Sequence, residues 1–271
     1  MNSFLIKCCC AAVLFVLINT VASAQDSDLF YDDIKSPPTP EELLKWHEIF
    51  TYEVRYSFFK LGEVKVEIVS DTLYSDKKSW HLKTIITSNS GIPFVGEEEN
   101  HYNSIFRAVD STFKVQKFWT DNVDEEEFRD SEYIFDREQQ KVYAYEIDQP
   151  RDTLALEEPA SSGHIIFYVG RLAAGTDSEV RVPIYLNREK KYMTVTNTTK
   201  TEKREYDAFP DEAETYYSKG KTDIDGPFGF SGEFEAWYLT NDLRVLVEAR
   251  VKVWLGNAKI KLIEYKKELR K

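Results

Sequence analysis

Hydrophobic and polar residues alternate with a period of two over much of this chain. In the run 50–58, apolar or aromatic side chains at every even position are separated by Thr, Glu, Arg and Ser. A period of two places alternate side chains on one face of a strand, so this run predicts a half-buried β-strand. The pattern resumes over 64–68 after a turn at 60–62. The two runs together predict a β-hairpin.

Further strands follow from the same alternation. In the middle of the chain the pattern predicts strands over 80–86, 113–119, 132–135 and 142–145. Near the C-terminus the runs 228–238, 245–253 and 258–262 are separated by turns at 240–242 and 256–257. These last three runs predict an antiparallel meander with charges of mixed sign on its outer face.

Two segments depart from this period and indicate short helices. Before the first strand, Thr39 can cap a helix, Pro40 suits its first turn, and Glu42 completes a capping box. This helix is expected to end near His47. The segment 161–173 has apolar residues at helical spacing and predicts a helix of two to three turns, capped by Ser161 or Ser162 and packed on the sheet. A buried strand is the alternative for this segment.

The first residues have the composition of a secretory signal peptide. Residues 1–24 contain Lys7, an apolar run over 11–18, and Ala22-Ser23-Ala24 at the end. We expect cleavage before Gln25, a flexible lead-in over 25–38, and a single antiparallel β domain over 39–271. A retained membrane anchor is the alternative, but the apolar run is far shorter than the roughly 20 residues that span a bilayer. The mature chain is therefore expected in the periplasm or outside the cell, with no membrane span.

Charge and cysteine content narrow the classes of partner and chemistry. The formal net charge is −12, which disfavours nucleic acid and anionic lipid surfaces as partners. All three cysteines lie in the leader at 8–10, so the mature chain has no thiol for a disulfide, a zinc site or nucleophilic chemistry.

Several segments of the chain are similar to one family of bacterial proteins. These are FTYEVRY at 50–56, KLGE at 60–63, YVGRL at 168–172, and FSGEFEAWYLTNDLRV at 230–245. They resemble the domain-of-unknown-function 3108 family of exported proteins over roughly residues 48–266. The resemblance implies a mainly β fold, one large, strongly curved antiparallel sheet or partly closed barrel, and an extracytoplasmic location. It implies no reaction.

One position departs from the family pattern. Leu246 stands where the family often has a proline just after the arginine of the last motif. Because proline is confined to strand edges, the leucine predicts that this strand is paired on both sides.

No catalytic arrangement is evident in the sequence. The mature chain has four histidines without the spacing of a zinc motif, and no nucleophile elbow or phosphate-binding glycine loop. Glu97, Glu99 and His101 alternate on one strand and suggest at most a weak divalent-ion site, while Ser161 and Ser162 near His164 are explained by helix capping. We expect no enzyme activity, no metal and no cofactor.

Aromatic residues make up 14% of the chain, and much of this content belongs to the core, because strands are enriched in aromatic residues. Aromatic side chains also line cavities for apolar ligands. The residues expected to line such a site are Phe118, Trp119, Phe167, Tyr168, Trp237 and Trp254. The leading hypothesis is a non-enzymatic envelope protein that holds a lipid or acyl chain in the concave face of its sheet. The alternatives are an assembly factor that binds envelope proteins through a strand edge and, with less support, a hydrolase.

Overall fold

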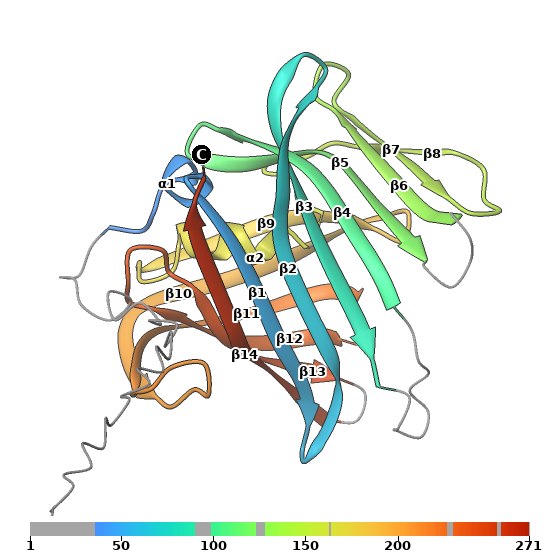
Figure 1. The fold of residues 1–271 in the computed structure, drawn as a ribbon. Coiled ribbons are helices and arrows are strands. Elements are labelled where there is room, and N and C mark those ends of the chain that lie inside the picture. Colours follow the sequence, from blue (N-terminus) through green and yellow to red (C-terminus); the bar gives the residue numbers. More distant parts are fainter. Residues whose placement is uncertain are drawn as a thin grey trace, which may run out of the picture.

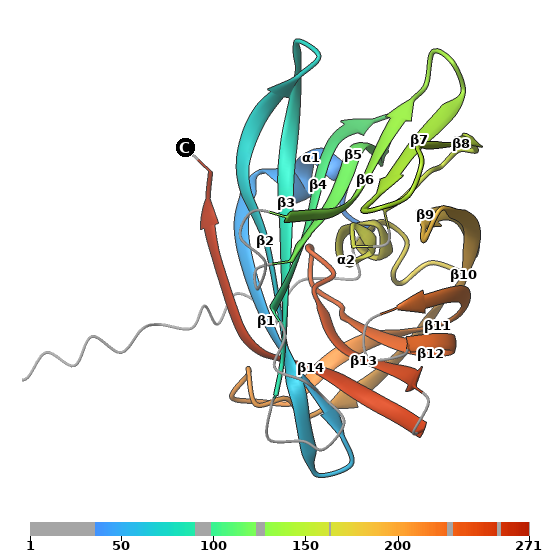
Figure 2. The same cartoon turned by 90° about the vertical axis from the view of Figure 1, so that its right-hand side faces the viewer.

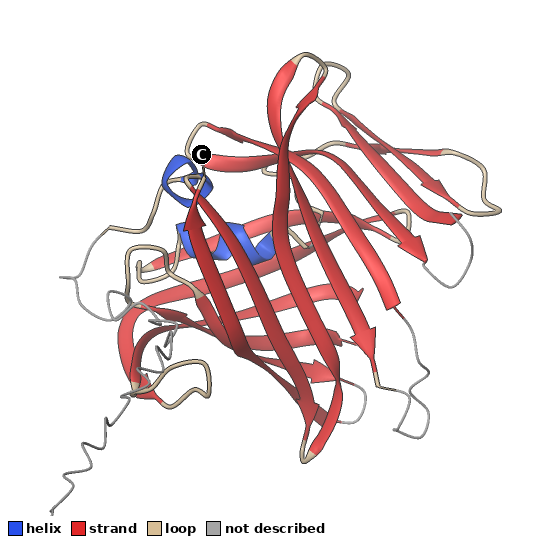
Figure 3. Ribbon diagram, in the orientation of Figure 1, coloured by secondary structure: helices blue, strands red, loops and turns tan. Residues whose placement is uncertain are grey.

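A computed structural model describes residues 36–89, 99–122, 128–162, 164–226, 230–253 and 256–270. In these ranges fourteen strands form one antiparallel sheet in the order β8-β7-β6-β5-β4-β3-β2-β1-β14-β13-β12-β11-β10-β9 (Figures 1 and 3). The predicted mainly β fold is thus confirmed. The proposed leader over 1–24 and Trp254 lie outside the described residues.

The first eight strands are β1 Trp46–Tyr56, β2 Phe59–Tyr74, β3 Lys77–Ser88, β4 Glu99–Val109, β5 Thr112–Asn122, β6 Phe128–Asp136, β7 Lys141–Glu146 and β8 Asp152–Ala155. The other six are β9 Ser178–Leu186, β10 Glu189–Arg204, β11 Ala213–Gly226, β12 Phe230–Leu239, β13 Leu246–Val253 and β14 Gly256–Leu269. The helical segments are α1 Pro40–Leu44, α2 Ile166–Val169 and the 3₁₀ turn η2 Gly170–Leu172.

The first predicted hairpin is present, but its turn lies earlier than expected. β1 and β2 are joined at Ser57 and Phe58, and residues 60–62 belong to β2. Gly62 pairs with Val54 on one side and with Ser88 on the other. A side chain at this glycine would overlap the Thr87 carbonyl, so here glycine permits close approach of strands instead of forming a turn.

The capping box of α1 is confirmed. Glu42 N donates to Thr39 Oγ1 at 3.2 Å, and Thr39 N donates to Glu42 Oε2 at 2.8 Å. The helix ends at Leu44, earlier than predicted, because Trp46 and His47 pair with β14 as the first residues of β1.

The helix predicted over 161–173 is present but shorter, and its predicted serine cap is wrong. α2 and η2 span 166–172, and the residue before α2, Ile165, makes no side-chain capping bond. Ser162 Oγ instead bonds Ser104 Oγ at 2.8 Å, and Ser161 forms a parallel bridge with Ile184 of β9. Both serines are therefore used to join this segment to the sheet.

The sheet bends so that its two halves face one another across α2. Figure 2 shows β2–β7 on one side and β9–β13 on the other, with α2 between them. A continuous cluster of buried apolar residues joins both halves to Ile165 and Tyr168 of the helical segment. The inner face of the bend is thus filled in part by side chains of the chain itself.

The sheet does not close, but its two edge strands are linked by side chains. Tyr185 Oη on β9 donates to the Ala155 carbonyl at 2.9 Å and accepts from Glu157 N at 2.8 Å. Lys190 and Tyr192 both bond the Glu157 carboxylate, at 2.9 and 2.7 Å. The structure is therefore a partly closed barrel, as the sequence predicts.

Two further observations concern strand pairing and membranes. β13 pairs with both β12 and β14, which confirms the prediction made from Leu246. Over the described ranges, every helix is too short or too polar to cross a bilayer.

Candidate functional site

A buried ion pair fixes the helical segment to the inner face of the sheet. Arg171 of η2 donates from Nη1 and Nη2 to the two carboxylate oxygens of Glu48 on β1, at 2.8 and 2.9 Å. Its Nε donates to the Leu243 carbonyl at 2.6 Å, and Tyr265 Oη donates to Glu48 at 2.7 Å. Burial by itself lowers the pKa of Arg171, but the adjacent Glu48 carboxylate outweighs it and the net pKa is raised. Arg171 and Glu48 therefore compensate each other's charge inside the protein.

Three rings beside α2 face the interior and yet remain partly exposed. His164 stacks on Tyr102 of β4 with 4.0 Å between ring centroids, and on Phe118 of β5 at 5.8 Å. Phe167 of α2 contacts Tyr52 of β1 at 5.5 Å. Tyr52 and Phe118 are buried, whereas His164, Tyr102 and Phe167 are only half-buried. His164, Tyr102 and Phe167 are therefore the partly exposed rings among otherwise buried aromatic residues beside α2.

His164 is uncharged at this position. Burial lowers its pKa to about 3, so the imidazole is neutral in any ordinary buffer. Neither of its ring nitrogens has a hydrogen-bond partner within the part of the chain that the structure describes. His164 therefore lies among the aromatic side chains of the interior, stacked on Tyr102 and Phe118, while its surface remains partly exposed. His164 thus offers one donor and one acceptor in an aromatic environment.

A few other polar groups reach the same inner face. Ser104 and Ser162 bond one another and are buried. The Thr84 hydroxyl on β3, next to Tyr102 in the ladder, is fully buried and has no hydrogen-bond partner. The inner face is therefore mainly aromatic and aliphatic, with uncharged polar groups near His164.

The structure distributes five of the six predicted lining residues between the two faces of the sheet. Phe118, Phe167 and Tyr168 lie on the inner face, where they pack in the same apolar cluster. Trp119 and Trp237 lie on the opposite face of β5 and β12, and Trp254 falls outside the described residues. Strand alternation explains this division, since Trp119 follows Phe118 directly and neighbouring residues point to opposite faces.

Sequence reasoning missed His164 and Tyr102 as inner-face residues. His164 was weighed only with its neighbouring serines, and Tyr102 lies in a strand whose alternation is weak. The helical spacing over 161–173 was the available signal, because a helix packed on the sheet brings its first residues onto the inner wall.

Trp119 belongs to a polar network on the outer face. Its Nε1 donates to Asp121 at 3.0 Å, its ring stacks on His81 at 5.3 Å, and His81 Nε2 contacts Asn103 Oδ1 at 2.9 Å. Burial lowers the pKa of His81 more than its bond to Asn103 raises it. The network satisfies the indole and imidazole groups and fixes them.

The weak ion site suggested for Glu97, Glu99 and His101 gains no support from the described residues. His101 Nε2 bonds Glu99 at 2.7 Å, while Glu97 lies outside the description. In the ranges described, no three potential ligands gather closely enough to hold a metal ion.

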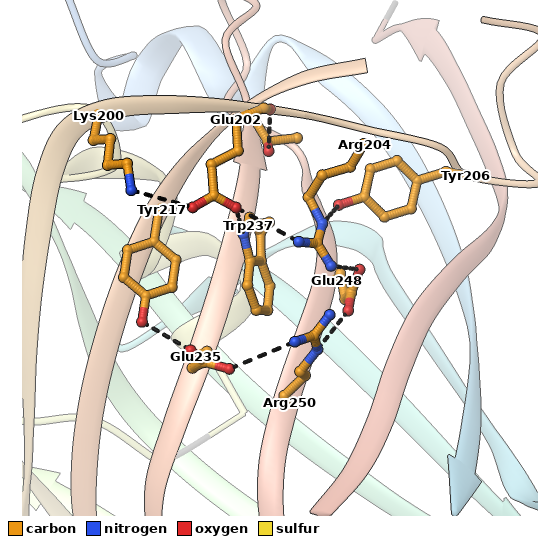
Figure 4. Close-up of polar contacts among 10 residues, drawn as sticks. Lys200, Glu202, Arg204, Tyr206, Tyr217, Glu235, Trp237, Glu248 and Arg250 are labelled. Carbon is orange, nitrogen blue, oxygen red and sulfur yellow. Dashed lines mark hydrogen bonds and ion pairs between the residues drawn. The ribbon is translucent and has the colours of Figure 1, made fainter. Parts of the chain in front are cut away.

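A second cluster surrounds Trp237 on the outer face of the C-terminal strands (Figure 4). The guanidinium groups of Arg204 and Arg250 lie against the indole, 4.2 and 4.8 Å from the ring centroid. Its Nε1 donates to Glu202 at 3.2 Å. Glu248, which is 1% exposed, accepts from Arg204 Nη2 at 2.8 Å and from Arg250 Nε at 2.9 Å. Trp237 is thus enclosed by charged groups and is not free to stack on a ligand.

An open groove of about 470 Å³ lies beside this cluster, over β10–β14. Tyr217, Glu235 and Arg250 belong to both the cluster and the groove. Tyr217 Oη donates to Glu235 at 2.9 Å, and burial followed by this contact raises the pKa of Tyr217 to about 12. The groove is polar, in contrast to the inner face.

The residues of the last sequence motif have structural roles. Gly232 has φ +81°, a conformation that favours glycine, in the bulged stretch of β12. Arg244 is fully buried, stacks over Tyr216 at 4.5 Å, and donates to the Thr240 and Asn241 carbonyls of the turn before β13. The motif therefore shapes the meander, as expected of a packing and turn motif.

Solved structures match the chain only at low similarity. A β-barrel-like protein of domain-of-unknown-function family 1849 from Brucella abortus has a TM-score of 0.47 and 10% identity, covering 83% of this chain and 98% of that one. A Bacteroides fragilis protein described as exported, with a YmcC-like fold, has a TM-score of 0.38 and 10% identity, covering 88% and 99%. A Parabacteroides distasonis protein described as a lipoprotein has a TM-score of 0.34 and 10% identity, covering 81% and 95%.

The comparison by sequence family is more specific. Curated proteins give no match to the chain. The profile of the family described as "protein of unknown function (DUF3108)" matches residues 51–263, which include part of β1, all of β2–β13 and part of β14. The chain therefore belongs to the domain-of-unknown-function 3108 family.

Proposed function

We propose that this protein is a non-enzymatic, exported envelope protein that binds an apolar ligand, such as a lipid or acyl chain, on the inner face of its sheet beside α2. The observation that carries the proposal is the set of half-buried rings of His164, Tyr102 and Phe167, which face the interior next to fully buried aromatic residues. When an apolar group covers partly exposed aromatic side chains, apolar surface is removed from water and the free energy falls.

The groups around His164 favour an apolar ligand over a charged one. His164 is neutral, and the adjacent ion pair of Arg171 and Glu48 is already satisfied within the protein. A charged group placed here loses its hydration without gaining a counter-charge, which costs several kcal/mol. A hydrocarbon chain has no such cost.

A role without catalysis agrees with the positions of the histidines. His81 and His101 lie on the outer face of β3 and β4, whereas His164 lies on the inner face. An acid–base pair needs two such groups within hydrogen-bond reach of one reacting centre. Partner binding through a strand edge has less support, since β8 and β9 are occupied with one another and with Ser161.

Fluorescence titration with N-phenyl-1-naphthylamine tests the proposal on the full mature chain. This apolar probe is expected to bind with saturation, and Phe167→Asp is expected to weaken binding at least tenfold. The ligand would have to desolvate the new carboxylate, and tenfold corresponds to about 1.4 kcal/mol.

Phe59→Asp is the matched control, because Phe59 is 44% exposed and lies in the β1–β2 hairpin against Phe58. It should leave binding within about twofold of the parent, well below the 1.4 kcal/mol that a tenfold change represents. Probe binding that is lost in Phe59→Asp but kept in Phe167→Asp would place the apolar site on the hairpin and contradict the proposal.

A further inference from the structure

The groove over β10–β14 lies on the face of the sheet that points away from α2. Met193 and Val195 of β10 pack with Ile166 of α2 on the inner side. Thr194 and Thr196 alternate with them and line the groove, so they face the other way. The groove therefore lies on the opposite face of the sheet from His164, Tyr102 and Phe167.

The lining has a charge opposite to that of the whole chain. Four cationic side chains and two carboxylates line the groove, namely Lys219, Lys221, Arg250, Lys252, Glu233 and Glu235. The chain carries a formal net charge of −12, whereas this lining has an excess of positive charge. A locally positive groove on an acidic protein attracts an anionic ligand and orients it.

The lysines of the groove are available to a ligand. Lys219, Lys221 and Lys252 are exposed and form no ion pair within the described part of the chain. Arg250 is different, because Glu248 holds its Nε at 2.9 Å and Trp237 lies against its guanidinium. The groove thus combines Arg250, which is held in place by Glu248, with three exposed lysines that form no ion pair within the described part of the chain.

The carboxylates in the groove distinguish between classes of anion. Glu233 and Glu235 lie on β12, opposite Lys221 and Lys219 on β11. They repel an anion that has no hydrogen-bond donors, but they can accept hydrogen bonds from hydroxyl groups. A ligand that carries both carboxylates and hydroxyls satisfies both kinds of side chain.

The shape of the groove favours a sugar over a peptide. It crosses the face of paired strands, so it offers no free strand edge for pairing with a peptide backbone. The nearby indole of Trp237 is 2% exposed and forms no pocket for an apolar side chain. Thr194 and Thr196 offer hydroxyls without partners in the described residues.

We infer that the groove binds an acidic oligosaccharide. Lys219, Lys221 and Lys252 contact its carboxylates, and Glu233 accepts hydrogen bonds from its hydroxyls. Arg250 and Glu235, held by the cluster around Trp237, form the fixed wall. The volume of about 470 Å³ is in the usual range of small-ligand sites, roughly 300–1,000 Å³.

Isothermal titration calorimetry of the full mature chain with tetragalacturonate tests this inference. We expect saturable binding that weakens as salt is added, because the contacts are exposed ion pairs. The double variant Lys219→Gln/Lys221→Gln should lose roughly tenfold or more in affinity, whereas naphthylamine binding stays unchanged.

The matched control is Lys77→Gln/Lys141→Gln, which removes the same charge from exposed lysines on β3 and β7. This control should bind tetragalacturonate within about twofold of the parent, a change far smaller than 1.4 kcal/mol. An equal loss in both double variants would show a general charge effect and overturn the inference.

Two other probes identify the class of ligand. Neutral galactose tetramer should bind at least tenfold more weakly than tetragalacturonate, since it lacks the carboxylates. Tetraglutamate of the same charge should also bind more weakly, because it lacks hydroxyls for Glu233. Equal binding of tetraglutamate would assign the groove to acidic peptides, and no binding of either anion would remove the site altogether.

Discussion

Arg171 and Glu48, which are 123 positions apart in the chain, form a two-point ion pair that joins the inner helical turn to β1. Both side chains are at most 1% exposed. Because Tyr265 and the Leu243 carbonyl complete the hydrogen bonding, the pair connects η2, β1, β14 and the turn before β13. It is a fully buried polar link between the inner helical turn and the sheet.

Glu48→Gln is expected to lower the free energy of unfolding by about 3–5 kcal/mol, since it leaves the buried Arg171 without a counter-charge. Urea denaturation monitored by tryptophan fluorescence measures the change. Glu264→Gln serves as control, because its partner Lys266 is exposed and such pairs contribute at most about 1 kcal/mol.

The double variant Glu48→Leu/Arg171→Met is expected to be more stable than Glu48→Gln alone, because apolar side chains leave no unpaired buried charge. Similar losses in Glu48→Gln and Glu264→Gln would contradict the role given to the buried pair.

The stability of the protein should fall below about pH 6.5 through His164. Burial lowers the pKa of this imidazole to about 3 in the folded chain, so the unfolded chain binds a proton first as the pH falls. The free energy of unfolding therefore drops by at most about 1.4 kcal/mol per pH unit between these values, and the contribution is fully present above the unfolded pKa.

Urea midpoints at pH 7.5, 6 and 5 measure this dependence. His164→Gln should make the profile flatter than that of the parent. Parallel profiles for the parent and His164→Gln would show that His164 is not a buried neutral group.

Gly220→Ala is expected to destabilise the protein by about 1–3 kcal/mol through overpacking. A methyl group at this position would overlap the Phe234 ring and approach the Thr194 carbonyl to 2.7 Å. Thermal unfolding of a double-mutant cycle with Phe234→Leu measures the coupling: the smaller side chain should recover part of the loss. Strict additivity of the two changes would rule out this contact as the cause.

Tyr185→Phe should loosen the contact between the two edge strands. The phenol bridges the Ala155 carbonyl and Glu157 N, so its loss leaves two backbone groups unpaired at a cost of about 1–3 kcal/mol. Hydrogen–deuterium exchange should speed up over β8 and 156–157. Tyr143→Phe on β7 is the control, since its hydroxyl bonds the exposed Gln139. Equal exchange in the two variants would show that the edges are held by other contacts.

The period of two predicted strands that have one regularly buried face, but it did not predict β8, β9, β10 or β11. In β1, for example, Tyr52 and Val54 are buried while Glu53 between them is only half-buried. The turn of the first hairpin could not be placed in this way, because the role of Gly62 depends on the close carbonyl of Thr87 in a third strand.

The candidate sites were less predictable than the fold. Alternation indicated that aromatic residues would reach the interior. It did not indicate that Trp237 would lie on the outer face, against the guanidinium groups of Arg204 and Arg250. Similarly, nothing local to His164 indicates its neutral state, which depends on Tyr102 and Phe118 from other strands. Both outcomes depend on tertiary contacts between distant segments.

Native mass spectrometry of the mature protein, purified from its own envelope without added detergent, shows whether an apolar ligand is bound beside α2. We expect a bound species with the mass of a lipid or fatty acid, retained in Phe59→Asp and lost in Phe167→Asp. A protein that carries only its own mass in every preparation, and that fails to take up a fatty acid supplied in excess, would contradict the proposed function.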